Sequence, residues 1–198
     1  MLLLNGVTPL IDGSMIYGSN YEVEDSIRAW KDGKLKIDNI KTSLGTIQQV
    51  PIDEYGLMVT YNDEPGQLFG NKFVNSRPIE KIFYTLFYLF HNQKAAELQQ
   101  QYQAANDEEL FQMTKKFVVG VIQKITFYDW IPAIFNRADF IDFYADGNPK
   151  INLDFVTAML KIISSSGDRV FDSVQDKKGF HTLFISLFHS FLTTPVSH

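Results

Sequence analysis

The chain has 198 residues, of which 45% are hydrophobic and 14% aromatic, and its formal net charge is −5. This length predicts one domain or a large piece of one, with enough apolar side chains for a sizeable core. Phosphate binding needs clustered Lys and Arg, so the acidic balance and the scattered basic residues argue against a nucleic-acid partner. The absence of cysteine excludes disulfides, thiolate metal sites and cysteine nucleophiles.

Neither a signal peptide nor a membrane span is expected from the sequence. The apolar start at residues 1–4 is too short for the core of a signal peptide, and no run approaches the roughly 18 apolar residues of a spanning helix. No Asn-x-Ser/Thr sequon is present either. We therefore expect that the chain, as written, has no route into the secretory pathway.

The stretch 5–19 is predicted to form a compact loop, because prolines and glycines interrupt it. Its short oxygen-bearing side chains are Thr8, Asp12 and Ser14. Calcium binds carboxylate, hydroxyl and carbonyl oxygens, and a loop can aim several of them at one point. An ordinary turn closed by an Asx-type hydrogen bond explains the same residues. The residues alone leave both interpretations open.

A short helix is predicted at residues 20–31. Asn20 can cap its start, Val23, Ile27 and Trp30 share one face, and Asp32-Gly33 ends it. Residues 38–76 show no sustained hydrophobic period, which predicts a long irregular loop.

Two long helices are predicted next, at residues 78–103 and 106–131. The first starts at Pro78 and has a wide apolar face. Asn106 can cap the second, and residues 107–109 place negative charge on its first turn. Pro132 is expected to end it. The apolar stripe of the second helix comprises Leu110, Phe111, Thr114, Phe117, Val118, Val121, Ile122 and Ile125. The short link makes the two helices antiparallel neighbours.

Another helix is expected at residues 151–163, and a last apolar segment at 180–192 is predicted to be helical. The fold class is therefore mostly α with long loops. Residues 1–163 are expected to form one partial domain, and residues 164–198 a divergent C-terminal segment.

Taken in order, these segments resemble the animal haem peroxidase family, and most closely the peroxidase-homology domain of dual oxidases. The resemblance is carried by Thr8–Ser19, Ile27-Arg28, Gly33–Leu35, Phe90–Asn92, Asp107–Gln112, Tyr128–Pro132, Pro149–Ile151 and Asp154–Ala158. It covers residues 5 to about 163. It implies a partial animal haem-peroxidase fold with two long antiparallel helices, shorter helices and long irregular loops.

The resemblance implies a haem iron held by a proximal His, with a distal His that moves protons and a distal Arg that stabilises charge on the breaking O–O bond. The distal His belongs upstream of the calcium loop, before the first residue of this chain. The other matching positions hold Phe73 for the catalytic Arg, Ser76 for a haem-linking Glu and Ile163 for the proximal His. Arg77 would match only after a shift in register. We therefore expect no catalytic residue, and no bound haem.

The resemblance also gives the loop at 5–19 a calcium-binding role. The ligands would be the Thr8 and Ser14 hydroxyls, the Asp12 carboxylate and the Leu10 carbonyl. A further aspartate ligand of the family lies beside the distal His, upstream of this chain. Because one charged ligand remains, we expect weak calcium binding or none.

The histidines are the remaining candidate ligands for a metal or for haem. His91 falls where the family has a His-Asn pair on a helix, which favours a buried, hydrogen-bonded side chain. His181 and His189 lie eight residues apart, about two helical turns, which is too far to share one ion, although either could serve as an axial haem ligand. His198 is terminal and expected to be solvated.

Three functions are compatible with these observations. The first is a non-catalytic dual-oxidase-type fragment that acts through structure or through contacts with the remainder of such a protein or its maturation factor, at the extracellular face of a membrane. The second is an active haem peroxidase that consumes hydrogen peroxide, and the third is a calcium-binding adhesion module on the same fold. Apolar surface left uncovered by missing neighbours further predicts marginal stability and self-association.

Overall fold

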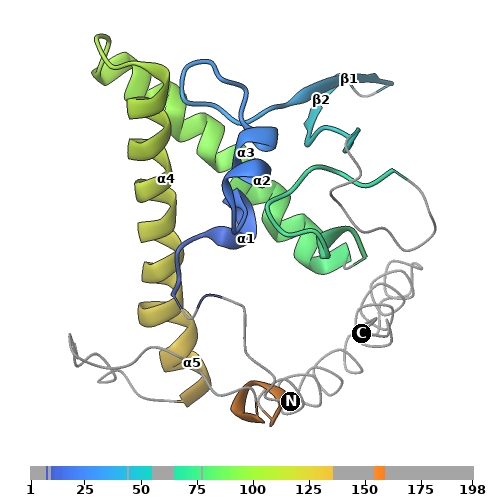
Figure 1. Cartoon of the computed structure of the whole chain (residues 1–198), viewed down its shortest axis with the longest axis vertical. Coiled ribbons are helices and arrows are strands. Elements are labelled where there is room, and N and C mark those ends of the chain that lie inside the picture. Colours follow the sequence, from blue (N-terminus) through green and yellow to red (C-terminus); the bar gives the residue numbers. More distant parts are fainter. Residues whose placement is uncertain are drawn as a thin grey trace. The chain divides into compact units, whose positions relative to one another are not determined.

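A computed structural model describes residues 8, 10–43, 45–54, 65–76, 78–135 and 154–158 (Figure 1). The chain divides into two compact units, one of Ile11–Ile141 and one of Met1–Leu10 with Asp142–His198. Each unit is considered by itself. The predictions made for Arg77, Ile163, His181, His189, His198 and the boundary after residue 163 lie outside the described residues. They stay predictions.

The unit Ile11–Ile141 is mostly helical, as predicted. Its helices are α1 (Ser14–Tyr17), α2 (Tyr21–Ile27), the 3₁₀ turn η1 (Val74–Ser76), α3 (Pro78–Gln101), α4 (Asp107–Lys124), the π-helical η2 (Ile125–Trp130) and α5 (Ile131–Phe135). Its strands are β1 (Asp38–Thr42) and β2 (Gly45–Gln49). The two long helices α3 and α4 contact each other, and they diverge from the turn that joins them (Figure 1). In the other unit, residues 154–158 are helical, within the helix predicted at 151–163.

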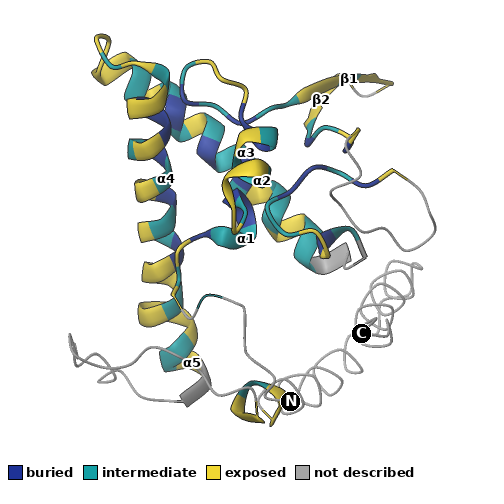
Figure 2. Cartoon of the chain, in the orientation of Figure 1, coloured by how far each residue is buried: buried dark blue, intermediate teal, exposed yellow. Residues whose placement is uncertain are grey.

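The start of α4 forms as its sequence predicts. The Asn106 side chain accepts a hydrogen bond from the Glu109 amide at 3.0 Å, and the Glu109 carboxylate accepts one from the Asn106 amide at 2.9 Å. This reciprocal pair is a capping box, which satisfies two amides that have no partner within the helix. The buried side chains of α4 are Leu110, Phe111, Thr114, Val118 and Ile122, which all belong to the predicted stripe (Figure 2).

The predicted end at Pro132 was wrong, because helical structure continues through α5. In an α-helix a proline ring clashes with the carbonyl four residues earlier. Here η2 precedes the proline, and the Ile131 amide bonds to the Thr126 carbonyl, five residues back. This wider bonding takes the backbone out of the α register immediately before Pro132. The proline then lies in the first turn of α5, where its missing N–H costs little.

The long loop predicted at 38–76 was also wrong in part, because β1 and β2 form an antiparallel hairpin. Ile40 pairs with Ile47, and the Thr42 hydroxyl donates to the Gly45 carbonyl at 2.7 Å. The remaining strand residues are mostly polar and exposed. The hairpin therefore has no alternation of apolar and polar residues that would reveal it in the sequence.

The predicted helix at 20–31 ends earlier than expected. α2 is capped by the Asn20 side chain, which accepts from the Val23 amide at 2.9 Å, and it stops at Ile27. Trp30 was placed on the face of this helix, which was wrong. It lies in a tight turn and has a left-handed φ of 56°.

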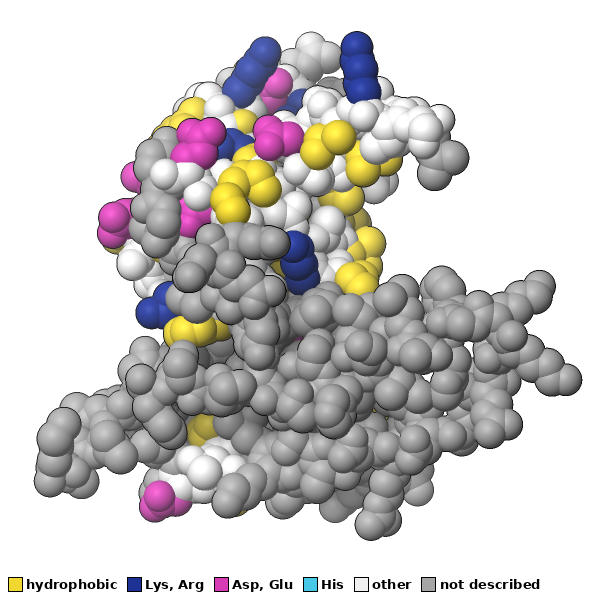
Figure 3. Space-filling view, turned by 90° about the vertical axis from the view of Figure 1, so that its right-hand side faces the viewer, with side chains coloured by type: hydrophobic (Ala, Val, Ile, Leu, Met, Phe, Trp, Pro, Cys, Tyr) yellow, Lys and Arg dark blue, Asp and Glu magenta, His cyan; other side chains and the backbone are white. Residues whose placement is uncertain are grey.

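The core of the unit lies between α1, α2, α3 and α4 and also receives residues from the segment 65–76 (Figure 2). Its largest fully buried side chains include Tyr17, Tyr88, Phe69, Phe111 and His91. Hydrophobic side chains also remain on the described surface (Figure 3). They include Ile82 and Leu86 of α3 and Tyr128 of η2, each at least 60% exposed.

A glycine is required where the segment 65–76 crosses α1. A methyl group on Gly70 would come within 2.3 Å of the Ile16 carbonyl group and 2.4 Å of the Gly18 nitrogen, which are backbone atoms. We expect Gly70→Ala to lower the free energy of unfolding by about 1–3 kcal/mol, measured by urea denaturation. Gly120 of α4 is the matched control, because a methyl group there meets nothing within 4 Å. Gly120→Ala should stabilise by about 0.5–1 kcal/mol. An unchanged midpoint for Gly70→Ala would contradict this contact.

Candidate functional site

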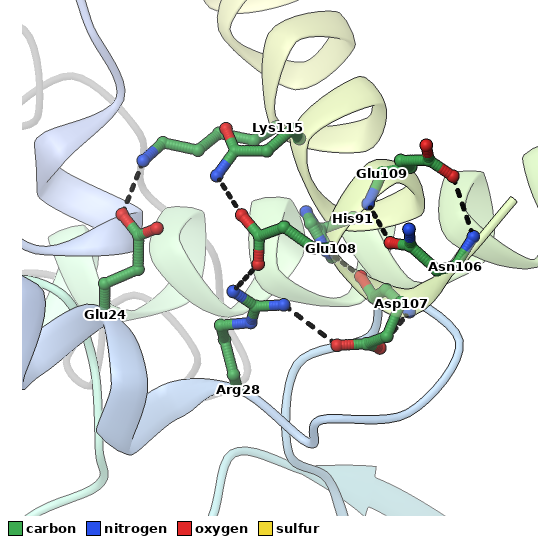
Figure 4. Close-up of polar contacts among 10 residues, drawn as sticks. Glu24, Arg28, His91, Asn106, Asp107, Glu108, Glu109 and Lys115 are labelled. Carbon is green, nitrogen blue, oxygen red and sulfur yellow. Dashed lines mark hydrogen bonds and ion pairs between the residues drawn. The ribbon is translucent and has the colours of Figure 1, made fainter.

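A buried arginine links the end of α2 to the start of α4 (Figure 4). Arg28 is 3% exposed and its Nη2 lies 2.9 Å from Asp107 Oδ2, while its Nη1 donates to Glu108 Oε2. The guanidinium also lies 4.1 Å from the ring centre of Phe111 and 4.0 Å from that of Trp30. A buried guanidinium is costly without counter-charges, so the two carboxylates and two rings stabilise it.

The two acidic residues that pair with Arg28 have further partners. Asp107 Oδ1 accepts a hydrogen bond from the Gly33 amide at 2.7 Å, and Glu108 Oε1 accepts one from the Gln112 side chain at 2.8 Å. The hydrogen bond from Gln112, and then that from Arg28, lower the pKa of Glu108 below its usual range. Asp107 and Glu108 thus hold Arg28 and Gly33 at the first turn of α4, the helix start where the sequence predicts these acidic residues.

His91 lies beside this cluster, in the middle of α3. Its Nε2 is 2.8 Å from the Gly33 carbonyl, and its Nδ1 is 2.9 Å from the Tyr17 hydroxyl. A carbonyl can only accept, so Nε2 carries the hydrogen and Nδ1 accepts from Tyr17. Burial lowers the pKa of His91 to about 4, and the positive charges of Arg28 and Lys115 act in the same direction. The imidazole is therefore neutral.

The turn at residues 30–33 lies between the contacts of Asp107 on one side and those of His91 on the other. Trp30, Asp32 and Gly33 all have left-handed φ values, which are uncommon for residues other than glycine. The Gly33 amide bonds to Asp107 and its carbonyl to His91, while Gln99 donates to Asp32 at 2.8 Å. The strained turn persists because contacts from both α3 and α4 fix it.

A second ion pair crosses from α2 to α4 close by. Lys115 Nζ donates to Glu24, and the same ammonium lies 5.3 Å from the ring centre of Tyr17 (Figure 4). Both polar clusters therefore join elements that are distant in the sequence.

Phe73, the residue predicted to match the catalytic Arg, precedes η1 and is 40% exposed. Lys72 lies with its Nζ 4.9 Å from the Phe73 ring centre. Ser76 ends η1, and its side chain is not among the described ones.

The candidate calcium ligands divide between the two units. Thr8 and Leu10 belong to one unit, where the Thr8 hydroxyl accepts from the Leu10 amide at 3.2 Å. Asp12 and Ser14 belong to the other, where Asp12 Oδ1 accepts from the Ser14 amide at 2.9 Å. The second contact is the Asx-type turn that was the alternative explanation. Across the described ranges, no group of three or more His, Asp or Glu side chains is arranged to hold a metal.

A sequence model of the animal haem peroxidase family matches residues 2–194. The chain belongs to this family. Among curated proteins, this chain is 29% identical over 175 residues to Dual oxidase 1 of Rattus norvegicus. It is 28% identical over 175 residues to Dual oxidase 2 of Homo sapiens. Each alignment covers 82% of this chain but 11% of the relative, so the chain spans about a tenth of the relatives' length.

Among solved structures, Peroxidase A from Dictyostelium discoideum is similar, with a TM-score of 0.64 and 24% sequence identity. The match covers 74% of this chain and 29% of that one. The predicted partial peroxidase fold is thereby confirmed, as is the relation to dual oxidases. Of the helices in the described part of this animal haem peroxidase chain, none has the length and apolar character needed to cross a bilayer.

Haem is the prosthetic group that the family implies, and the described residues do not fit it. His91 is the one histidine among them, and both of its ring nitrogens are engaged by Tyr17 and Gly33. As predicted, it is a buried structural histidine. Phe73, the residue predicted to match the family's arginine, has a side chain without positive charge. No reaction step through an iron centre follows from these residues.

Arg28 and Asp107 are the structurally important residues that the sequence did not reveal. Both occur in the motifs that carry the family resemblance, but nothing in their spacing shows that they pair across 79 positions. For Arg28, the sequence signal was a single basic residue at the end of an otherwise apolar helix face. Basic residues in such positions are common on protein surfaces.

Proposed function

We propose that this chain is a peroxidase-like module of the dual-oxidase type that does not cleave peroxide and that acts through structure and contacts with other polypeptide. The observation that carries the proposal is Phe73, a hydrocarbon ring at the position matched to the catalytic arginine. The partners it implies are the remainder of a dual-oxidase-like protein, a maturation factor of such a protein, or a second copy of the chain.

The chemistry explains why this substitution matters. Breaking a peroxide O–O bond separates charge, and a fixed positive group near the leaving oxygen stabilises that charge. A phenyl ring has no charge or hydrogen-bond donor to offer. At the position matched to the proximal ligand the sequence has Ile163, whose alkyl side chain cannot bind iron.

The polar side chains that are present favour the same proposal. Arg28, Asp107 and His91 are occupied in joining α2, the turn at 30–33, α3 and α4. These contacts tie the three side chains into the fold, as expected of residues that rigidify a scaffold.

Haem reconstitution tests the proposal. We expect the full chain to show no saturable 1:1 Soret absorption on titration with haem and no peroxide-dependent oxidation of a dye. Ile163→His is the matched variant: a Soret band that appears in it and not in the wild type would assign the loss to the missing ligand. A 1:1 haem complex of the wild type with peroxide turnover would overturn the proposal in favour of an active peroxidase. Calorimetric heat with calcium that Asp12→Ala abolishes would favour the calcium-binding module instead.

A further inference from the structure

Two tyrosines are fully buried in the core, and their hydroxyl groups have different kinds of partner. Burial raises the pKa of both Tyr17 and Tyr88 above the usual range of a phenol. The Tyr88 hydroxyl donates to the Ile27 carbonyl at 3.1 Å, and a carbonyl oxygen does not take up the proton. The Tyr17 hydroxyl instead lies 2.9 Å from Nδ1 of His91, the unprotonated nitrogen of a neutral imidazole. Tyr17 therefore donates to a base, and Tyr88 does not.

This difference matters when a buried phenol loses an electron. An oxidised phenol is a very strong acid, and it becomes a neutral radical where a base accepts the hydroxyl proton. Nδ1 of His91 is placed to accept it along the existing hydrogen bond from Tyr17. Burial lowers the pKa of His91, but the oxidised phenol is by far the stronger acid. The bond from Nε2 to the Gly33 carbonyl would then stabilise the imidazolium.

A chain of close contacts connects Tyr17 with a tryptophan at the surface. The ring of Phe111 lies edge-on to that of Tyr17, with the ring centres 6.0 Å apart. The Arg28 guanidinium lies over the Phe111 ring at 4.1 Å and over the Trp30 ring at 4.0 Å. Trp30 is 56% exposed. An electron can therefore move between Tyr17 and Trp30 through groups that are in contact at each step.

The charges along this chain favour the oxidised state at its inner end. The positive Arg28 lies against the Trp30 ring, so it destabilises a positively charged indole radical. The oxidised Tyr17 becomes neutral, because its proton moves to His91. The Lys115 ammonium, 5.3 Å from the centre of the Tyr17 ring, is paired with an acidic side chain of α2. The Tyr17 radical is therefore the more stable of the two.

We propose that Tyr17 and His91 form a redox site that takes up an oxidising equivalent from a one-electron oxidant acting at Trp30. The oxidant, a radical of the kind that peroxide chemistry yields, is reduced by one electron from the Trp30 ring. One electron then moves from Tyr17 to Trp30, and the Tyr17 hydroxyl proton moves to Nδ1 of His91. The products are a neutral Tyr17 radical, a His91 imidazolium and a restored Trp30. The site goes beyond the proposed function, since it needs neither haem nor another polypeptide.

Pulse radiolysis of the full chain with the azide radical tests the site, because this radical oxidises indole in preference to phenol. The chain has two tryptophans, so Trp130→Phe leaves Trp30 as the single point of entry. In this background we expect the absorption of the indole radical to decay as that of a tyrosyl radical rises, at a rate independent of protein concentration. Tyr17→Phe should abolish this phase. Tyr88→Phe is the matched control and should leave the phase unchanged, since Tyr88 is equally buried but donates to a carbonyl.

His91→Gln tests the proton acceptor separately. A glutamine can keep both hydrogen bonds but takes up no proton, so the phase should slow about a hundredfold or more. In the His91 parent the phase should be slower in heavy water, because the proton moves with the electron. A phase that survives Tyr17→Phe, or that His91→Gln leaves unchanged, would overturn the site, as would indole radicals that decay only by reaction between molecules. None of these outcomes bears on haem binding, which the titration with the Ile163→His variant tests.

Discussion

Replacing Asp107 by alanine is expected to lower the free energy of unfolding by about 3–5 kcal/mol, the loss typical of breaking one partner out of a buried ion pair. The Asp107 side chain is 26% exposed and Arg28 is almost fully buried, so solvent screens their interaction little. The substitution also removes the acceptor of the Gly33 amide, which fixes the strained turn at 30–33. Since a domain has about 5–15 kcal/mol in total, urea denaturation should show a large shift of the midpoint.

The structure provides a matched control one residue further on. Glu108 binds the same guanidinium from the same first turn of α4, but its side chain is 55% exposed. Glu108→Ala should therefore cost less than about 1 kcal/mol. Adding Arg28→Met to Asp107→Ala should recover part of the lost stability, because it removes the uncompensated buried charge. Equal costs for Asp107→Ala and Glu108→Ala would show that the two pairs act only through the charge at the helix start.

The structural features that could be predicted from the sequence are those that residues close together in the chain determine. The capping box of Asn106 and Glu109 spans four residues, and the buried stripe of α4 follows from helical periodicity. The hairpin β1–β2 could not be predicted, because its polar, exposed strands carry no alternating pattern. Nor could η2, since its wider bonding depends on how the backbone adapts to Pro132.

The contacts of His91 also divide into a part that could be predicted from the sequence and a part that could not. The sequence predicted that His91 is buried and hydrogen-bonded, but through its family resemblance and not through its neighbours. Its partners Tyr17 and Gly33 lie 74 and 58 residues away, and only the packing of α1 and the turn at 30–33 against α3 brings them together. The match of Phe73 to the catalytic arginine, in contrast, is predicted from motif spacing alone, because it concerns which residue is present and not where it lies.

Acidification is expected to destabilise the fold through His91. The unfolded chain titrates this histidine near pH 6.5, and burial lowers the pKa in the folded chain to about 4. Between these values the unfolded state binds a proton that the folded state does not, so the free energy of unfolding falls as the pH falls from about 6.5 to about 4. The difference of about 2.5 pKa units corresponds to about 3 kcal/mol. Below pH 4 both states are protonated, and this contribution stops changing.

His91→Gln isolates the effect, because carboxylates also titrate in this range. A glutamine can donate to the Gly33 carbonyl and accept from Tyr17, but it does not bind a proton. The difference in unfolding free energy between wild type and His91→Gln, measured by urea denaturation from pH 7 to pH 4, should therefore shrink by about 3 kcal/mol. Tyr17→Phe removes the hydrogen bond that favours the unprotonated Nδ1 but keeps the titrating ring, so its pH dependence should remain and be shallower than that of the wild type. If wild type and His91→Gln lose stability in parallel, then His91 is not the group that makes this fold sensitive to acid.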